Sequence, residues 1–245
     1  MPERIRFRLP MSTVSSPRFA LYLAPPPADP LSQAAARWLG HDPETGRSYQ
    51  PEPAAGLAAA RIAALTEAPR RYGFHATLKP PFRLAEGCDE ARLIVALERF
   101  TMVRRPLRLP PLKLAKIGGF FALVPSAPSE EIQALAADCV RDFDHLRAPP
   151  SEQELARRRA ARLTPRQEEY LLQWGYPYVM EEFRLHFTLT GDVPDAAESA
   201  ALERHLQAMT ARFTRTEYRV DDICLFVQTA PDRPFRIAGR YPLGG

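Results

Sequence analysis

Two short segments of the chain carry the same pattern of side chains, and that pattern suits acid–base chemistry. The chain reads FHATL around His75 and Thr77, and LHFTL around His186 and Thr188. Successive side chains of a β-strand point to opposite faces of a sheet. If both segments are strands, each one presents a histidine and a threonine together on a polar face and turns its apolar residues to the core.

Two histidines and two threonines on such faces are suited to phosphoryl chemistry. An imidazole has a pKa of about 6.5, so near neutral pH one histidine can accept a proton while the other donates one. Threonine hydroxyls can donate hydrogen bonds to phosphoryl oxygens, and the same parity adds the cations Lys79 and Arg184 to the two faces. The set predicts attack on a phosphodiester with four catalytic residues: His75, Thr77, His186 and Thr188.

Metal binding is the competing use of paired histidines. Zinc and iron sites usually include a third histidine, cysteine or carboxylate. No such residue lies beside the pair on these strand faces, and Glu182 shares the parity of His186 but lies two pleats away. We therefore predict no metal and no cofactor, and only a ligand from elsewhere in the chain would change this.

Other residues near the two segments are candidates for substrate contacts. Tyr22, Tyr72 and Tyr178 could stack on a sugar or base, and Lys79 and Arg184 could contact the phosphate. Arg236 and Arg240, on one face of the last predicted strand, are weaker candidates for substrate contacts. The other three histidines, His41, His145 and His205, are expected to be solvated. The three cysteines, Cys88, Cys139 and Cys224, are expected to be buried core residues.

The elements around the two segments occur in the same order. In each half a strand carrying the histidine is followed by an amphipathic helix and a hairpin, and Gly118-Gly119 is a strong signal for the first hairpin. Pro80 and Pro81 are expected to end the first of these strands, and residues 175–191 are expected to form the second as a strand or strand pair. We predict an α+β fold of two lobes, with antiparallel sheets flanking a central cleft and helices outside. The first repeat is expected over residues 17–126, a helical insertion over 127–175 and the second repeat over 176–245.

The helical insertion is rich in arginine. Ser151 with Glu154, and Thr164 with Gln167, predict capped helix starts within it. Its arginines around residues 157–162 are interpreted as a solvated helix face, because charged residues on a helix usually face water. The sequence does not indicate whether the insertion lies near the cleft.

The composition is that of a globular protein. The chain has 245 residues, of which 45% are hydrophobic and 25% charged, with a net charge of +4, and its acidic and basic residues are interspersed. No run approaches the 18 or so apolar residues that a membrane helix needs, and three widely spaced cysteines predict no disulfide framework. We expect a cytoplasmic protein whose residues 1–16 form a flexible tail, with either Met1 or Met11 as the start.

Two longer blocks carry a resemblance to a known family. RRYGFHATLKPPF and WGYPYVMEEFRLHFTLTG resemble the 2H phosphoesterase superfamily, which has two His-x-Thr/Ser motifs in a duplicated α+β fold, over essentially residues 17–242. More specifically, they resemble a bacterial branch of unknown function associated with phosphonate-metabolism operons. The resemblance implies catalytic roles for His75, Thr77, His186 and Thr188.

The favoured function is a metal-independent cyclic phosphodiesterase. One histidine would deprotonate water, the other would protonate the leaving oxygen, and the threonines would hold the phosphoryl oxygens; the pattern does not say which histidine is the base. The substrate is expected to be a small anionic cyclic phosphate of a sugar or nucleotide. The operon association of the resembling branch suggests ribose 1,2-cyclic phosphate.

Two alternatives remain open at this stage. One is an enzyme that processes RNA ends or resembles a 2′,5′-ligase, and the other is a protein that binds a phosphorylated metabolite without turnover. Nucleic acid is the less favoured partner, no membrane partner is expected, and the sequence does not indicate the oligomeric state.

Overall fold

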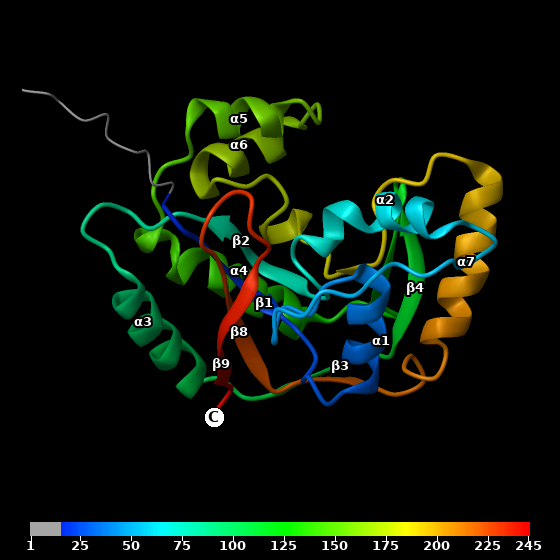
Figure 1. Ribbon diagram of the computed structural model, residues 1–245. Helices are drawn as coiled ribbons and strands as arrows, with labels where there is room; N and C mark the ends of the chain where they lie inside the picture. The colour runs from blue at the N-terminus through cyan, green and yellow to red at the C-terminus, as the bar shows by residue number, and fades with distance from the viewer. Residues whose placement is uncertain (1–15) are drawn as a thin grey trace, which may run out of the picture.

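A computed structural model describes residues 16–245, and these residues form an α+β fold (Figure 1). The predicted tail over residues 1–16 lies outside the described residues except for Ser16. The strands are β1 Arg18–Leu23, β2 Ala76–Phe82, β3 Leu107–Leu109, β4 Leu112–Ile117, β5 Phe120–Pro125, β6 Phe187–Thr188, β7 Tyr218–Val220, β8 Asp222–Gln228 and β9 Arg236–Pro242. The helices are α1 Pro30–Leu39, α2 Ala59–Arg70, α3 Glu90–Met102, α4 Glu130–Asp142, α5 Glu152–Arg159, α6 Pro165–Trp174 and α7 Ala196–Thr210, with 3-10 turns at Asp144–Leu146 and Met180–Glu182.

The predicted α+β class with an antiparallel sheet is confirmed. Seven strands form one sheet in the order β4-β5-β6-β2-β1-β8-β9, every pair in it is antiparallel, and β3 pairs with β7 separately. The expected element order occurs as β2-α3-β3-β4-β5 and again as β6-α7-β7-β8-β9. The strands of the two halves alternate in groups within this single sheet, and β2 of the first half pairs with β6 of the second.

The halves also exchange their hairpins. The β4-β5 hairpin of the first half pairs with β6 of the second, and the β8-β9 hairpin of the second half pairs with β1 of the first. The helices follow the same rule, because α3 packs against β9 and α7 packs against β4. The pseudo-two-fold relation therefore centres on β2 and β6, the strands that begin directly after His75 and His186.

The main core lies on one face of this sheet. Phe19, Leu21 and Leu23 of β1 enter that core together with residues of α1, α3, α4 and α7. The alternate residue Tyr22 packs on the opposite face in a smaller apolar cluster that includes Phe226 of β8. Strand alternation thus separates a core face from a second face that is free to form a site.

Two local predictions about strands need correction. Pro80 and Pro81 were expected to end the second strand, yet β2 continues through both to Phe82. This is tolerated because β2 pairs with β6 only at Ala76, which leaves the rest of that edge without ladder hydrogen bonds for a proline to break. The expected strand or strand pair over residues 175–191 is reduced to the two residues of β6, preceded by a 3-10 turn.

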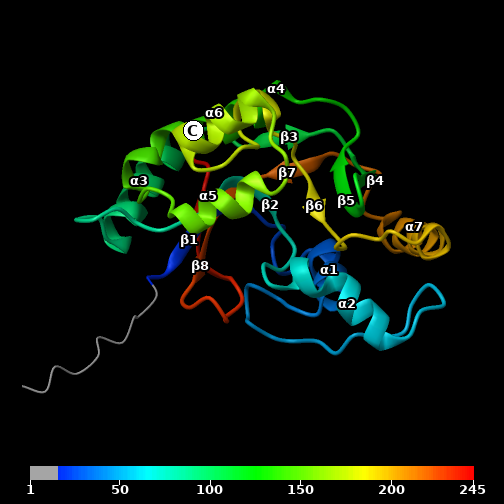
Figure 2. The ribbon, with the colours of Figure 1, turned by 90° about the horizontal axis from the view of Figure 1, so that it is seen from above.

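Residues 127–175 contain α4 and the two shorter helices α5 and α6, and the last two lie side by side in both ribbon views (Figures 1 and 2). Both predicted capping boxes are present, Ser151 with Glu154 on α5 and Thr164 with Gln167 on α6. Tyr170 of α6 lies in one apolar cluster with Val140 of α4, and α4 packs against β2, which fixes these helices to the sheet.

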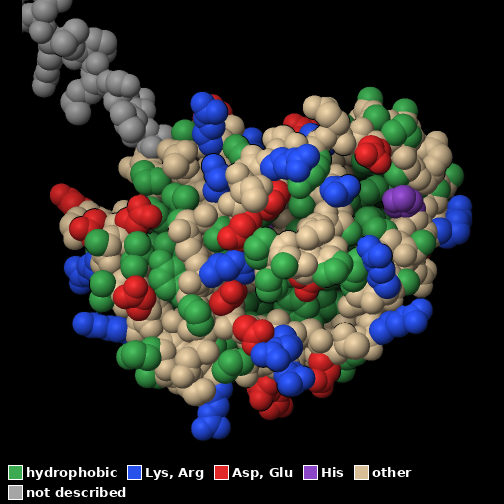
Figure 3. All heavy atoms as spheres, turned by 60° about the horizontal axis from the view of Figure 1, so that its bottom comes forward, with side chains coloured by type: hydrophobic (Ala, Val, Ile, Leu, Met, Phe, Trp, Pro, Cys, Tyr) green, Lys and Arg blue, Asp and Glu red, His purple; other side chains and the backbone are tan. Residues whose placement is uncertain are grey.

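Charge on the surface is mixed, as the sequence predicts. Lys and Arg side chains alternate with Asp and Glu side chains over the face drawn in Figure 3. Within residues 16–245, no helix combines the length and apolar character that crossing a membrane requires.

Candidate functional site

The two strands that begin directly after the histidines lie next to each other. β2 and β6 pair through Ala76 and Phe187, the apolar residues that separate each histidine from its threonine, and both are fully buried. This antiparallel register sets His75 opposite Thr188 and Thr77 opposite His186. Because Ala76 and Phe187 face the core, strand alternation turns the other residues to the opposite face. Each histidine therefore stands beside the threonine of the other motif, as a two-fold axis between the strands would require.

Both imidazoles are held in the same way. Nδ1 of His75 lies 2.9 Å from the carbonyl oxygen of Gly73, and Nδ1 of His186 lies 2.7 Å from that of Arg184. A carbonyl oxygen can only accept, so each Nδ1 carries the proton and donates it. The neutral form of each ring thus has its lone pair on Nε2, and no residue of the described chain hydrogen-bonds to either Nε2.

Aromatic rings enclose His75. Its ring stacks on Tyr22 with centroids 4.1 Å apart, and the centroids of Tyr72 and Phe226 lie at 5.5 and 5.9 Å. The pKa of His75 is lowered to about 4: burial lowers it most, the hydrogen bond to Gly73 opposes this, and the nearby His186 also lowers it. His75 is therefore neutral at physiological pH and can accept a proton.

A pocket of about 340 Å³ opens on this face of the sheet. Of the predicted site residues, Tyr22, Tyr72, His75, Thr77 and Thr188 line it. His186 is absent from the lining, but its ring centroid lies 5.7 Å from that of Phe120, which is part of the wall. The structure thus gathers six of the predicted residues at one place.

The prediction that Lys79 faces this pocket is wrong. Lys79 is 1% exposed, and its Nζ donates to the carbonyl oxygen of Val140 on α4, on the core face of the sheet. The cause is a β-bulge. Tyr22 pairs with Thr77 while its neighbour Leu21 pairs with Lys79, so the strand gains a residue between them and the side-chain alternation is reset.

Arg184 and Tyr178 are not brought to the pocket either. Arg184 is exposed, and its guanidinium donates to the carbonyl oxygens of Glu181 and Phe183. Tyr178 is 40% exposed and packs edge-on against Tyr176 instead. The expected cationic contribution from these strands is therefore missing, and a cation that lines the pocket comes from another element.

That element is the helical insertion, and the prediction that its arginines only face solvent is wrong for Arg158. Arg158 of α5 lines the pocket, and its guanidinium carbon lies 4.5 Å from the ring centroid of Tyr176, another wall residue. Phe120 and Asp192 also line the pocket, although the sequence did not indicate them, and so does Thr190, which shares the strand parity of His186 and Thr188. Burial raises the pKa of Tyr22 most, and the nearby phenol groups of Tyr72 and Tyr176 also raise it.

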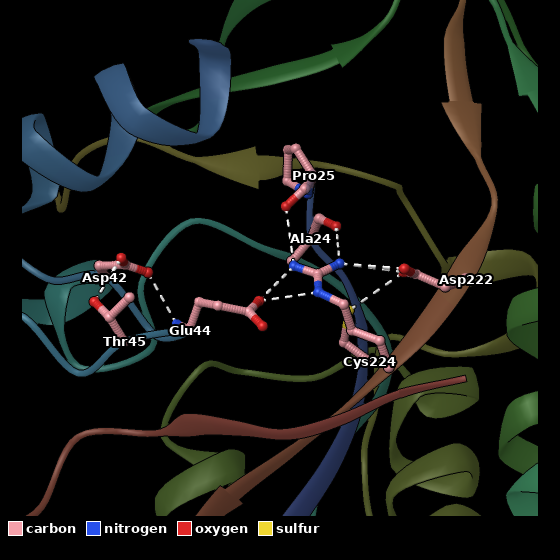
Figure 4. A network of polar contacts seen from close by, with 8 residues as sticks. Ala24, Pro25, Asp42, Glu44, Thr45, Asp222 and Cys224 are labelled. Atoms are coloured by element: carbon pink, nitrogen blue, oxygen red, sulfur yellow. Dashed lines mark hydrogen bonds and ion pairs between the residues drawn. The ribbon is translucent and has the colours of Figure 1, made fainter. Parts of the chain in front are cut away.

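The weaker arginine candidates on β9 serve the fold. Arg240 bonds to Glu44 and Asp222 and to the carbonyl oxygens of Ala24 and Pro25 (Figure 4). Arg236 donates to the carbonyl oxygen of Thr45 in the same loop. These contacts fasten the loop after α1 to the sheet and leave neither arginine in the pocket lining.

One of the other histidines differs from expectation. His41 is 3% exposed, and its Nε2 lies 2.9 Å from the carbonyl oxygen of Phe235. It is a hydrogen-bonded core residue rather than a solvated one. Cys139 and Cys224 are buried as predicted, and Cys88 is half-buried.

Comparison with known proteins gives a family. The family model described as "Protein of unknown function (DUF1045)" matches residues 77–236, which is more than half of the chain. The chain belongs to this family. Two curated relatives of this DUF1045 chain are named Ribose 1,5-bisphosphate phosphokinase PhnN. The one from Janthinobacterium sp. (strain Marseille) is 37% identical over 96% of this chain and 52% of its own length, and the one from Laribacter hongkongensis (strain HLHK9) is 37% identical over 90% and 50%.

The chain spans about half the length of the curated relatives it matches. Among solved structures, the DUF1045 chain is similar to TT0787 of Thermus thermophilus, with 16% identity, coverage of 93% of this chain and 98% of that chain, and a TM-score of 0.42. It is also similar to Usb1 of Kluyveromyces marxianus, with 11% identity, coverage of 93% and 98%, and a TM-score of 0.35.

Proposed function

We propose that this chain is a phosphodiesterase of the 2H phosphoesterase type that opens a cyclic phosphate on a ribose-type sugar. The observation that carries the proposal is the paired geometry of His75 and His186. Each imidazole has its Nδ1 anchored to a main-chain carbonyl and its Nε2 without a hydrogen-bond partner among residues 16–245, and each stands beside the other motif's threonine.

His75 is the general base in this proposal. Its low pKa keeps it neutral near pH 7, and its anchored Nδ1 leaves the lone pair on Nε2. A general base must be unprotonated in the free enzyme, and a general acid must carry a proton. His186, whose ring is not stacked between tyrosines, takes the role of the acid.

The reaction then balances as follows. Nε2 of His75 removes a proton from water, and the water oxygen attacks phosphorus. The bond between phosphorus and one of the two ester oxygens of the cyclic phosphate breaks, and that oxygen receives the proton from Nε2 of His186. The hydroxyls of Thr77 and Thr188 donate hydrogen bonds to the non-bridging oxygens, where negative charge increases in the transition state. The product is a phosphomonoester with a free neighbouring hydroxyl, and proton exchange with solvent resets both histidines.

Two features support a ribose phosphate as the substrate. The pocket of about 340 Å³ has the size of sites for small metabolites and is walled by Tyr72 and Tyr176, whose half-buried rings can pack on a sugar. The curated relatives are named as kinases of ribose 1,5-bisphosphate, which is itself a phosphorylated ribose, and this name supports the same class of substrate.

Phosphorus NMR of ring opening tests the proposal. Purified protein in excess EDTA is offered ribose 1,2-cyclic phosphate and a nucleoside 2′,3′-cyclic phosphate in parallel. We expect the wild type to open the ribose 1,2-cyclic ring faster, and His75→Ala and His186→Ala each to lose about 100-fold or more in rate. His145→Gln, which removes an exposed histidine, is the matched control and retains full activity.

The outcomes separate the alternatives. Faster opening of the nucleoside ring would favour RNA-end processing. Dependence on added metal would overturn metal independence. If neither ester is turned over but the corresponding phosphomonoester binds tightly, the protein binds a phosphorylated metabolite and is not an enzyme for these esters.

A further inference from the structure

A second hollow lies beside the histidine pocket, and it is rich in arginine. Arg158 and Pro81 line both hollows, so they are adjacent. The second hollow has a volume of about 40 Å³, and Arg18, Arg83, Arg147 and Arg157 also line it, whereas Glu154 is its only acidic residue among the described part of the chain. A third hollow of about 290 Å³ shares Arg18, Arg83, Glu154 and Arg157 with it.

Two of these arginines are neutralised within the protein. Arg83 makes two hydrogen bonds of 2.9 Å to the carboxylate of Glu154, and Nε of Arg147 lies 2.7 Å from the carboxylate of Asp144. Their positive charge is matched, and the single acidic residue of the hollow is used up by Arg83.

Within the described residues, the other three arginines have no acidic partner. Nε and NH2 of Arg18 donate to the side-chain oxygen of Gln228, which is a neutral group, at 2.8 and 2.5 Å. Within residues 16–245, neither Arg157 nor Arg158 pairs with a carboxylate, although their helical neighbour Arg159 pairs with Glu168 at 2.6 Å. The hollow therefore concentrates about three uncompensated guanidinium groups.

Arg158 is also held in place. Its guanidinium carbon lies 4.5 Å from the ring centroid of Tyr176, and its side chain is half-buried between the two hollows. A guanidinium fixed against an aromatic ring loses less conformational freedom when it binds a phosphate. Arg18, by its hydrogen bonds to Gln228 and its position 5.5 Å over the ring of Phe235, is held in a similar way.

We propose that Arg18, Arg157 and Arg158 form a second anion subsite that binds a phosphomonoester group of the substrate. This inference rests on the proposed function, because it assigns the substrate's cyclic phosphate to the histidine pocket and a second phosphate to the hollow next to it. A phosphomonoester carries nearly two negative charges at pH 7 and accepts hydrogen bonds from several guanidinium donors at once. The substrate class is then a ribose cyclic phosphate that carries a further phosphate elsewhere on the sugar, and the helical insertion supplies this specificity.

The test compares two esters that differ in one group, ribose 1,2-cyclic phosphate with and without a 5-phosphate. We expect the wild type to prefer the 5-phosphorylated ester in kcat/KM. Arg157→Gln/Arg158→Gln should reduce kcat/KM for that ester by about 10- to 100-fold and bring the ratio between the two esters close to one. Arg159→Gln is the matched control, since it removes one charge from the same helix but lies outside both hollows, and it keeps the wild-type ratio.

Calorimetric binding of ribose 5-phosphate gives a second, independent readout. Binding should weaken in the Arg157→Gln/Arg158→Gln variant by about the same factor, persist in Arg159→Gln, and persist in His75→Ala/His186→Ala. A wild-type ratio near one, a ratio that survives the double arginine variant, or binding that this variant does not change would overturn the subsite.

Failure of the subsite and failure of the proposed function look different. Ring opening without a preference for the 5-phosphate removes the subsite and leaves the phosphodiesterase. Arginine-dependent binding of ribose 5-phosphate without opening of either ring removes the phosphodiesterase and leaves the subsite.

Discussion

The enclosure of His75 by aromatic rings predicts a specific dependence of stability on pH. Its pKa is about 4 in the folded protein and about 6.5 when the chain is unfolded. Between these values the unfolded chain binds more protons at this residue than the folded one does, so the stability contributed by neutral His75 is fully present above about pH 6.5 and is lost as the pH falls towards 4. The difference corresponds to about 3 kcal/mol.

His75→Gln isolates this contribution because glutamine does not titrate. We expect the free energy of unfolding of the wild type, measured by urea denaturation, to fall relative to that of His75→Gln by about 2 to 3 kcal/mol between pH 7 and pH 4. Taking the difference between the two proteins at each pH cancels the titration of all other groups, including the buried His41. His145→Gln, which removes an exposed histidine, should show less than about 0.5 kcal/mol of change over the same range. A wild-type minus His75→Gln difference that is independent of pH would refute the argument that burial suppresses protonation of His75.

Three further predictions concern residues around the site. Lys79→Met should leave stability at pH 7 unchanged or raise it by up to about 3 kcal/mol, because burial lowers the pKa of this lysine to about 8. Wild-type stability should also rise between pH 8 and 10.5, and urea denaturation should find no such rise in the variant. Gly73→Ala should lower the free energy of unfolding by about 1 to 3 kcal/mol, because Gly73 has a φ of +72° and an added Cβ would lie 2.6 Å from a ring atom of Pro43. It should also reduce kcat, because the carbonyl of Gly73 anchors His75. A variant with wild-type stability and kcat would contradict this. Arg240→Met should lower the free energy of unfolding, measured by heat or urea, by about 2 kcal/mol or more, because Glu44 and Asp222 lose their partner. Arg236→Met, at the exposed end of β9, should lower it by less than about 0.5 kcal/mol. Equal effects would argue against a stabilising role of the Arg240 ion pairs.

The sequence was sufficient for the parts of the site that depend on strand alternation. The His-x-Thr spacing places a histidine and a threonine on one face of a strand whatever the rest of the fold does, and the structure brings the two strands together through Ala76 and Phe187. Helix starts were equally predictable, since capping boxes such as Ser151 with Glu154 are local. The catalytic roles of these residues stay a prediction until activity is measured.

Other features depend on contacts that no local pattern contains. Alternation failed at Lys79 because a bulge between Thr77 and Lys79 turns the lysine to the other face of the sheet. The role of the insertion was missed because a run of arginines has the same composition whether it faces water or a neighbouring pocket. Arg157 and Arg158 differ from Arg159 only in what lies opposite them in space, which is a hollow for the first two and Glu168 for the third.

The pH dependence of kcat/KM for a cyclic phosphodiester tests the central claim, that His75 and His186 act as base and acid, most directly. We predict a bell-shaped profile for the wild type whose acidic limb lies near pH 4, where His75 becomes protonated, and whose rate falls again at higher pH as the acid loses its proton. In His75→Gln the residual activity should lose the acidic limb, and in His186→Gln it should lose the alkaline limb. A flat wild-type profile between pH 4 and 9 with chemistry rate-limiting, or an acidic limb that survives in His75→Gln, would contradict the account.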